Sequence, residues 1–334
     1  MMELLRKRAY ARAGLIGNPS DGYHGKTISV IVRNYYAEVV LYPWEDMELI
    51  PSQEDKSRFG SVHELVQDVE LHGYYGGLRL VKATIKKFVE FCRDRFPLHD
   101  RNFSVRYESN IPRQVGMAGS SAIIVATLRA LMEFYEVQIP LHVQPSLVLS
   151  VEREELGISA GLQDRVIQIF EGLVYMDFSE GVMQAEMGLS YGAYETLDTS
   201  LLDQIYIAYC TDVGEPTEVL HNNLRLRYDR QEPDVVEAMT QFADLASAGR
   251  EALGKGDLPE LGRLMDQNFD LRQKICALPA KHVEMVERAR ESGASAKFAG
   301  SGGAIVGVYQ GQAMLEQLKI SLGEVGCKVI LPRC

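Results

Sequence analysis

The sequence predicts an α+β protein of two domains. Segments typical of strands and of helices interleave along the 334 residues without the regular alternation of a doubly wound sheet. Three glycine-bearing loops, at residues 14–25, 116–119 and 300–303, each lie beside a strand-like or helical segment. Around residues 180–200 the periodicity weakens, and the chain beyond is richer in helical patterns. We therefore expect domains at residues 1–198 and 199–334.

Strand-like segments open the first half. Residues 9–16 are small and apolar, residues 18–22 have turn chemistry, and residues 27–41 are rich in β-branched and aromatic side chains. This pattern predicts a strand, a tight loop, and then one long strand or two paired strands. Charged residues 45–72 predict a surface excursion with a short helix near His63. The elements expected next are a helix at 78–96, a strand at 101–108, a helix at 144–156 and a strand at 173–178.

The second half begins with a predicted strand at residues 205–211. Helical patterns then dominate to residue 292, with one break at residues 254–257, Gly-Lys-Gly-Asp. Residues 296–309 predict a strand pair interrupted by glycines. A helix at 312–322 and a strand at 327–331 are expected to close the chain.

Residues 110–135 form the stretch around which the chain is organised. The first part is a loop with Gly116 and Gly119, and the second part is apolar on nearly all sides, as in a buried helix. Ser120 stands where an N-cap residue is expected, so backbone N–H groups after it point toward the loop. Small residues let a phosphate approach this backbone, and the helix dipole favours its charge. The stretch predicts a phosphate-binding loop; the alternative is a flexible loop before a core helix.

The charge balance limits the class of partner. The chain has 35 basic and 46 acidic residues, a net charge of −11, which argues against a nucleic acid or an anionic membrane as the main partner. The cysteines are scattered without a C-x-x-C pair, and the sequence has neither a signal peptide pattern nor an apolar run long enough to span a membrane. We expect a cytoplasmic, soluble protein that binds a small molecule, as a monomer or a homodimer.

Two isolated motifs are weak. The end of a P-loop is present at Gly25-Lys26-Thr27, but serine occupies the position of the first glycine and the following residues predict a strand. His63-Glu64 lacks the second histidine of a zinc-binding helix, because Gln67 stands there.

Asp164 is more informative. It follows a loop of small residues, after a helix that carries Glu152, Glu154 and Glu155. A carboxylate at this place can accept a proton or hold a cation; the alternative is that it only caps the next helix. One of the three glutamates can turn inward toward a magnesium ion while the others remain on a solvated face.

Taken together, the three loops resemble the GHMP kinases, the superfamily of galactokinase, homoserine kinase, mevalonate kinase and phosphomevalonate kinase. Residues 112–122, PRQVGMAGSSA, resemble the Pro-x-x-x-Gly-Leu-Gly-Ser-Ser-Ala signature, with Met117 and Ala118 as departures. Residues 11–25 resemble the first family motif and residues 297–306 the third. The resemblance covers essentially the whole chain. It implies an N-terminal domain similar to a small-subunit ribosomal protein, a ferredoxin-like C-terminal domain, and an active site in the cleft between them.

The resemblance also implies ATP and Mg²⁺ as cofactors and a role for each matching residue. Asp164 matches the catalytic aspartate, and Arg12 matches the cation that keeps this aspartate ionised. Ser121 and Glu152 match the serine and glutamate that hold Mg²⁺. The residues expected to contact the phosphates of ATP are Pro112, Gly116, Met117, Ala118, Gly119, Ser120, Ser121 and Ala122.

Within the superfamily, stretches such as GLVYMDFS and NFDLRQKI resemble the glucuronokinase branch. The implied reaction transfers the γ-phosphoryl group of ATP to the anomeric hydroxyl of D-glucuronate, which gives glucuronate 1-phosphate for UDP-glucuronate salvage. Asn18 replaces a glutamate that lies near the C6 hydroxyl in galactokinase. A glutamate would repel a C6 carboxylate by about 1 kcal/mol in water and several in a low-dielectric pocket, whereas an amide can donate a hydrogen bond.

A cationic partner for this carboxylate is expected at Arg79 or Arg113, because an arginine can bind a carboxylate through two hydrogen bonds. The other residues expected to contact the substrate are Asp21, Tyr23, Tyr191, Gly300, Ser301, Gly302 and Gly303.

Two alternatives stay open at this point. The first is a GHMP kinase for another small alcohol, such as a galactose-like sugar or a mevalonate derivative, because the motifs identify the phosphate chemistry better than the acceptor. The second is a catalytically silent nucleotide-binding sensor. The presence of Asp164, Glu152, Ser121 and Arg12 argues against the sensor.

Overall fold

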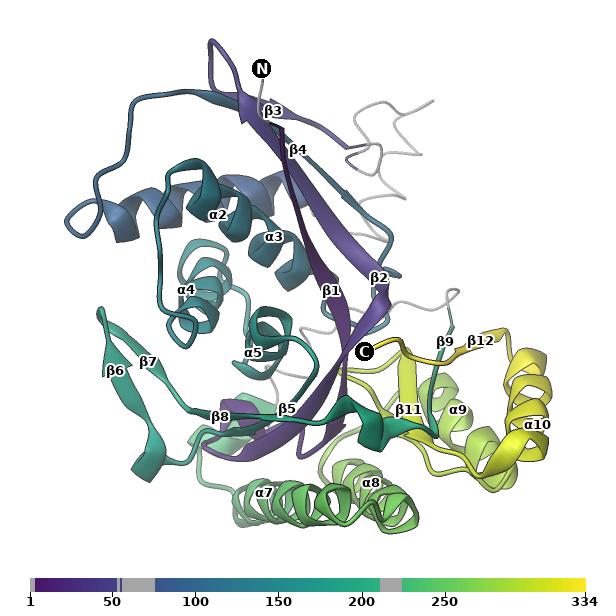
Figure 1. Cartoon of the computed structure of the whole chain (residues 1–334). Coiled ribbons are helices and arrows are strands. Elements are labelled where there is room, and N and C mark those ends of the chain that lie inside the picture. Colours follow the sequence, from purple (N-terminus) through teal and green to yellow (C-terminus); the bar gives the residue numbers. More distant parts are fainter. Residues whose placement is uncertain (1–3, 53–54, 56–75, 211–223) are drawn as a thin grey trace, which may run out of the picture.

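The computed structural model describes residues 4–52, 55, 76–210 and 224–334. Helices and strands interleave along this chain, and the two larger of its three described sheets lie side by side, each with its own helices (Figure 1). The predicted α+β class is confirmed. The short helix expected near His63 lies outside the described residues.

The larger sheet is built around two long strands, β1 (Leu5–Ile16) and β2 (Lys26–Pro43), which pair antiparallel. Of the two arrangements that the sequence allowed, the structure has one long strand, because β2 is continuous over 18 residues. The sheet order is β3-β4-β2-β5-β8, with β1 on β2. The bounds of the remaining strands are Glu48–Ile50 for β3, Phe103–Ser109 for β4, Leu173–Asp177 for β5 and Ala193–Leu197 for β8.

Four helices lie on one side of this sheet (Figure 1). They are α2 (Gly77–Cys92), α3 (Gly119–Phe134), α4 (Gln144–Ser150) and α5 (Gln163–Phe170). The predicted buried helix is α3, whose residues 121–128 are all buried, and it packs against β1 and β2. Burial of apolar area at about 25 cal/mol per Å² makes such a helix the centre of the core. The large apolar core therefore supports the residues that precede and begin α3.

The region from residue 180 to residue 200 contains strands that the sequence did not reveal. A hairpin of β6 (Gln184–Glu186) and β7 (Leu189–Tyr191) is followed by β8, which pairs with β5. Most side chains of these three strands are half-buried or exposed, so they carry no apolar alternation. Short helices among the described residues include η1 (Ser20–Gly22), η2 (Val151–Glu155), η3 (Glu180–Val182) and η4 (Thr199–Leu202).

The smaller sheet has the order β10-β11-β9-β12. Its strands are β9 (Ile205–Cys210), β10 (Lys297–Phe298), β11 (Ala304–Val308) and β12 (Cys327–Ile330), and its helices include α8 (Leu258–Ile275), α9 (Ala280–Glu291) and α10 (Gly311–Glu324). Helix α7 (Pro233–Gly254) pairs with α8 and packs on β2. The break at 254–257, the glycine-interrupted strand pair and the last helix and strand are as predicted. A domain boundary near Asp198 stays our proposal; it lies between the last strand of the larger sheet and the first of the smaller.

The two sheets meet at an irregularity in β2. Tyr10 and Ala11 are neighbours in β1, but their partners in β2 are Tyr36 and Val32, so residues 33–35 bulge out of the ladder. The backbone N–H of Arg33 donates to the carbonyl oxygen of Arg333 at 2.8 Å, so the end of the chain pairs with this bulge. The described residues include no helix with both the length and the apolar character needed to cross a bilayer.

Candidate active site

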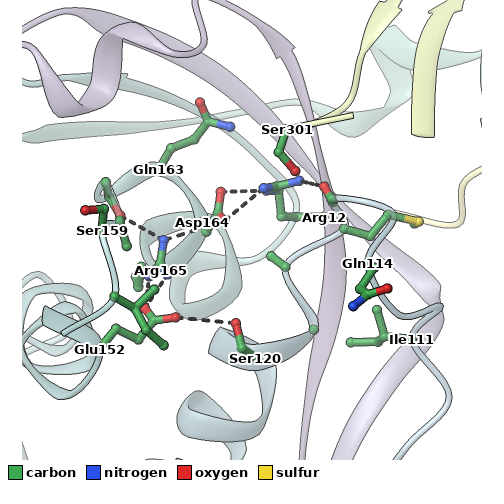
Figure 2. Close-up of a pocket in the computed structure, with 18 of the residues that line it drawn as sticks. Arg12, Ile111, Gln114, Ser120, Glu152, Ser159, Gln163, Asp164, Arg165 and Ser301 are labelled. Carbon is green, nitrogen blue, oxygen red and sulfur yellow. Dashed lines mark hydrogen bonds and ion pairs between the residues drawn. The ribbon is translucent and has the colours of Figure 1, made fainter. Parts of the chain in front are cut away.

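A cavity of about 520 Å³ lies where the three glycine-bearing loops converge. Its wall includes the loop after β1, the loop before α3, the start of α5, and Gly300 and Ser301 from the smaller sheet. Figure 2 shows side chains from these segments, which are far apart in sequence, pointing toward one another. The volume is in the range of small-molecule sites.

The start of α3 forms the part of the wall where the sequence predicts a phosphate site. The helix begins at Gly119, and the preceding Ala118 is left-handed with φ 61°. Ser120 is therefore inside the first turn, and the prediction that it is the N-cap is wrong. The N–H groups of this first turn have no acceptor within the helix, and the helix dipole makes their surroundings positive. The predicted residues that line the cavity here are Pro112, Gly116, Met117, Ala118, Gly119 and Ser120.

Ser121 and Ala122 do not line the cavity. Both side chains are fully buried, on the face of α3 that packs into the core. The hydroxyl of Ser121 donates to the carbonyl oxygen of Ala118 at 3.3 Å, which satisfies it within the helix. The phase of the helix, fixed by its start at Gly119, turns these two residues toward the core.

Asp164 and Arg12 form a bidentate ion pair at the centre of the cavity (Figure 2). Nε of Arg12 donates to Oδ1 of Asp164 at 2.6 Å, and Nη2 donates to Oδ2 at 2.8 Å. Asp164 is in the first turn of α5, not in a loop. Arg12 is only 5% exposed and also donates from Nη1 to the carbonyl oxygen of Gly116 at 2.5 Å. The pair is thus fixed to the loop before α3.

Glu152 is the glutamate that turns inward. It is 0% exposed, whereas Glu154 and Glu155 pair with lysines of α2. Residues 151–155 form a π-helical turn, a feature common at functional sites. Burial raises the pKa of Glu152, and the charge of Arg165 opposes this effect. Nε of Arg165 donates to Oε2 of Glu152 at 2.5 Å.

Arg165 joins the two carboxylates of the site. Besides its bond to Glu152, its Nη1 lies 3.5 Å from Oδ2 of Asp164 and donates to the carbonyl oxygen of Gly161 at 2.9 Å. Burial lowers the pKa of Arg165, but the charges of Glu152 and Asp164 outweigh burial, and the pKa is raised. The sequence analysis missed this residue, although it directly follows Asp164.

The residues fit a magnesium ion bound together with phosphate oxygens. Mg²⁺ at nucleotide sites takes one or two protein oxygens and completes its octahedron with phosphates and water. The serine beside Glu152 is Ser120, whose hydroxyl lies 3.5 Å from Oε1 of the glutamate (Figure 2). Ser121, the serine expected to hold the metal, is buried in the core instead. Ser120 and Glu152, both of which line the cavity, are therefore the oxygen donors that would hold the ion.

The loop after β1 supplies a second part of the wall, with Asn18, Asp21 and Tyr23. Oδ2 of Asp21 accepts a hydrogen bond from the backbone N–H of Gln163 at 3.2 Å. Burial, assisted by the charge of Asp164, raises the pKa of Asp21 from 3.8 to about 6. A Cβ on Gly161 would lie 1.9 Å from Oδ2 of Asp21, so only glycine leaves room for this carboxylate.

The second and third glycine loops are in direct contact. A Cβ on Gly300 would lie 2.2 Å from the carbonyl oxygen of Gly116 and 2.9 Å from Nη1 of Arg12. Gly300 and Ser301 line the cavity, whereas Gly302 and Gly303, also predicted to contact the substrate, lie behind them and do not.

Two further predicted residues lie away from the cavity. Tyr191 is on the β6–β7 hairpin, where its hydroxyl donates to Gln184 and its ring lies against His142. Figure 1 places this hairpin at the far side of the helical layer. Arg79, at the start of α2, does not line the cavity either, whereas Arg113 does.

The cavity is basic although the protein is acidic. Six arginines and three carboxylates line it, and two of these arginines were predicted, Arg12 and Arg113. The other four were not predicted, although two of them directly follow a predicted carboxylate. They are Arg153, Arg165, Arg225 and Arg272. Such a cavity is suited to a ligand with several negative charges.

Comparison with known proteins agrees with this geometry. The family model described as the GHMP kinases N terminal domain matches residues 79–172. The chain is 43% identical to "Probable glucuronokinase 2" and 42% identical to "Glucuronokinase 1", both from Arabidopsis thaliana, over 90% of the chain and 82% and 84% of those proteins. The crystal structure of Lactococcus lactis galactokinase complexed with galactose superposes with a TM-score of 0.79 at 15% identity, over 99% of this chain and 93% of that one.

A two-sheet α+β fold with an anion-binding helix start and a fixed aspartate–arginine pair defines a class of small-molecule phosphotransferases. The sequence identity to the two Arabidopsis proteins shows which family of phosphotransferases this is. The chain belongs to the GHMP kinase family.

Proposed function

We propose that the protein is an ATP-dependent kinase that phosphorylates the anomeric hydroxyl of D-glucuronate. One observation carries the proposal: Asp164, fixed by Arg12, lines the same cavity as the first turn of α3. Phosphoryl transfer to an alcohol needs a group that orients the attacking hydroxyl and a site that binds phosphate. The 43% identity to a probable glucuronokinase supports glucuronate as the acceptor.

The chemistry follows from the positions of the two groups. The acceptor oxygen attacks the γ-phosphorus of ATP, the bond from this phosphorus to the β–γ bridging oxygen breaks, and the hydroxyl proton passes to a carboxylate oxygen of Asp164. Two hydrogen bonds from Arg12 hold the carboxylate in place and keep it ionised. The free N–H groups at the start of α3 stabilise the charge on the phosphates.

Ser120 and Glu152 would hold Mg²⁺, and the bound ion would neutralise charge on the β- and γ-phosphates. Arg165 opposes the rise that burial causes in the pKa of Glu152 and so favours the ionised form, which a metal-binding carboxylate requires. On the acceptor side, Asn18 and Asp21 would bind the sugar. Asp21 is suited to ring hydroxyls because its carboxylate lines the cavity near Asp164.

The biological setting follows from the reaction. The product, glucuronate 1-phosphate, would enter UDP-glucuronate synthesis by salvage of the free sugar acid. We place this activity in the cytoplasm, with ATP and the sugar acid as the small-molecule partners and a monomer or homodimer as the working form.

The direct test measures ADP release with Mg·ATP against glucuronate, galacturonate, glucose, galactose and mevalonate. Turnover with glucuronate and little with galactose is expected. Turnover with galactose or mevalonate in place of glucuronate would contradict the assigned acceptor. ATP binding without turnover on any of the five would contradict the assigned activity and favour a nucleotide sensor.

A further inference from the structure

Lys297 is a buried ammonium without a carboxylate partner. It is 1% exposed, at the start of β10, and its Nζ donates three hydrogen bonds, to the carbonyl oxygen of Gly14 at 2.7 Å, Oδ1 of Asn18 at 2.6 Å and the carbonyl oxygen of Phe298 at 2.7 Å. Three acceptors require three N–H groups, and only the protonated amine has three. All three acceptors are neutral, and no ion pair of Lys297 is found among the described residues.

Lys297 fixes the orientation of the Asn18 amide. An ammonium can only donate, so the oxygen of the amide must face Lys297 and the NH₂ group must point the other way. Asn18 is 5% exposed and lines the cavity. Within the described ranges its NH₂ group makes no hydrogen bond to the protein. The amide therefore presents two donors to a ligand in the cavity.

Arg272 is a second buried cation near this place. It is 3% exposed on α8 and lines the cavity. Its Nη1 donates to the carbonyl oxygen of Gly300 at 2.7 Å and its Nη2 to that of Ser301 at 3.3 Å, and no carboxylate in the described part of the chain pairs with it. Burial lowers the pKa of Arg272, and burial together with the charges of Arg272 and Arg12 lowers the pKa of Lys297.

Arg272 on the cavity wall and Lys297, which contacts the wall residue Asn18, are therefore buried positive charges that no carboxylate among the described residues balances. Arg12 is balanced by Asp164, whereas Lys297 and Arg272 contact only neutral oxygens. Buried charges without a counter-ion are costly, and a bound anion removes that cost. A neutral ligand leaves both charges unbalanced, so the wall selects for an anionic group.

We propose that Asn18 and Arg272 bind the carboxylate of the acceptor sugar, and that Lys297 is the positioning residue that orients the Asn18 amide toward it. This inference rests on the proposed function and refines it, because it assigns carboxylate recognition to this wall in place of Arg79 or Arg113. An aspartate at position 18 would pair with Lys297 and present an acceptor instead of two donors. It would therefore repel the carboxylate that asparagine binds.

The experiment compares glucuronate with glucuronamide, which keeps every hydroxyl and replaces the carboxylate by a neutral amide. Values of kcat and KM are measured for both sugars in the wild-type protein and in Asn18→Asp, Arg272→Gln and Lys297→Met. Arg263→Gln is the matched control, because Arg263 is on the same helix and pairs with Glu260 at the surface. ATP affinity and the thermal midpoint are measured for each variant to verify folding.

Loss of a hydrogen bond to a charged group changes affinity by roughly 10- to 100-fold. Arg272→Gln and Lys297→Met are therefore expected to raise KM for glucuronate by about 10-fold or more, with small changes in kcat and in KM for glucuronamide. Asn18→Asp is nearly isosteric and is expected to raise KM for glucuronate by about 100-fold while glucuronamide still binds. Arg263→Gln is expected to match the wild type for both sugars.

The outcomes separate the inference from the proposed function. A wild-type protein that turns over glucuronate, with selectivity unchanged in folded Asn18→Asp and Arg272→Gln, overturns the inference and leaves the function intact. Loss of selectivity for glucuronate over glucuronamide in Arg113→Gln, but not in Arg272→Gln, also overturns the inference. That result would identify Arg113 as the residue that binds the carboxylate. A wild-type protein without activity on glucuronate overturns both.

Discussion

The raised pKa of Asp21 makes a testable prediction about stability. Burial and the charge of Asp164 raise this pKa from 3.8 to about 6. A carboxyl whose pKa is higher in the folded state than in the unfolded state is stabilising while protonated, and this contribution is lost as the pH rises through about 6. At neutral pH the ionised Asp21 is therefore a cost to folding, which Asp21→Asn should remove.

The size of the effect follows from the shift. Each pKa unit corresponds to about 1.4 kcal/mol, so a shift of about two units gives roughly 3 kcal/mol in the free energy of unfolding. The unfolding entropy per residue for a chain of this length converts this to a rise in Tm of about 4 °C. The amide oxygen of asparagine can still accept the hydrogen bond from the N–H of Gln163, so no contact is lost.

Thermal unfolding of wild type and Asp21→Asn at pH 7.5 and pH 4.5 is the assay. The variant is expected to be more stable at pH 7.5, and most of the difference should disappear at pH 4.5, where wild-type Asp21 is protonated. Asp46→Asn, on an exposed turn, is the control and should shift neither value. An Asp21→Asn variant that gains nothing at pH 7.5, or gains equally at both pH values, refutes the reasoning. Catalysis should fall in the same variant, because we propose that this carboxylate binds the sugar.

Four further substitutions test the site. Asp164→Asn is expected to lower kcat about 10³-fold with ATP affinity by calorimetry unchanged, and near-normal turnover would contradict its catalytic role. Ser120→Ala is expected to raise the Mg²⁺ concentration for half-maximal rate about 10-fold. Ser121→Ala should leave it unchanged, because the Ser121 hydroxyl is hydrogen-bonded inside α3. The opposite result in a Mg²⁺ titration would identify Ser121 as the metal ligand. Gly161→Ala places a Cβ 1.9 Å from Oδ2 of Asp21. KM for the acceptor should therefore rise about 10-fold or more, while KM for ATP stays the same. An unchanged acceptor KM would show that Asp21 does not bind the sugar.

Local patterns were sufficient to predict most of the fold. Apolar side chains on nearly every side of residues 122–131 indicate a buried helix wherever it packs, and glycines mark its start. The strands at 184–197 were not predicted, because their side chains are exposed or half-buried and show no apolar alternation. Strand formation there depends on pairing with β5, which no local pattern encodes.

The site residues that lie in or beside a loop motif could be predicted from the sequence. Those that only the tertiary structure brings to the cavity could not. Arg12, Asp164 and Glu152 were found because each lies in or beside such a motif. Ser121 was chosen over Ser120 because the choice depends on the helix phase, which the left-handed Ala118 sets. Arg272 and Lys297 belong to stretches that resemble the family, residues 268–275 and 297–306, but only the tertiary structure brings Arg272 to the cavity wall and Lys297 to Asn18.

The strand order of the smaller sheet has a consequence for biosynthesis. β9 lies between β11 and β12, both of which are encoded much later in the chain. The ribosome must add roughly a hundred residues after β9, which takes on the order of ten seconds, before either neighbour exists. During that time β9 has two unpaired edges, a state that favours aggregation. The loop before α3 is synthesised early, whereas Gly300, which lines the same cavity, is synthesised about 180 residues later, so the cavity wall is completed only after the smaller sheet has been made.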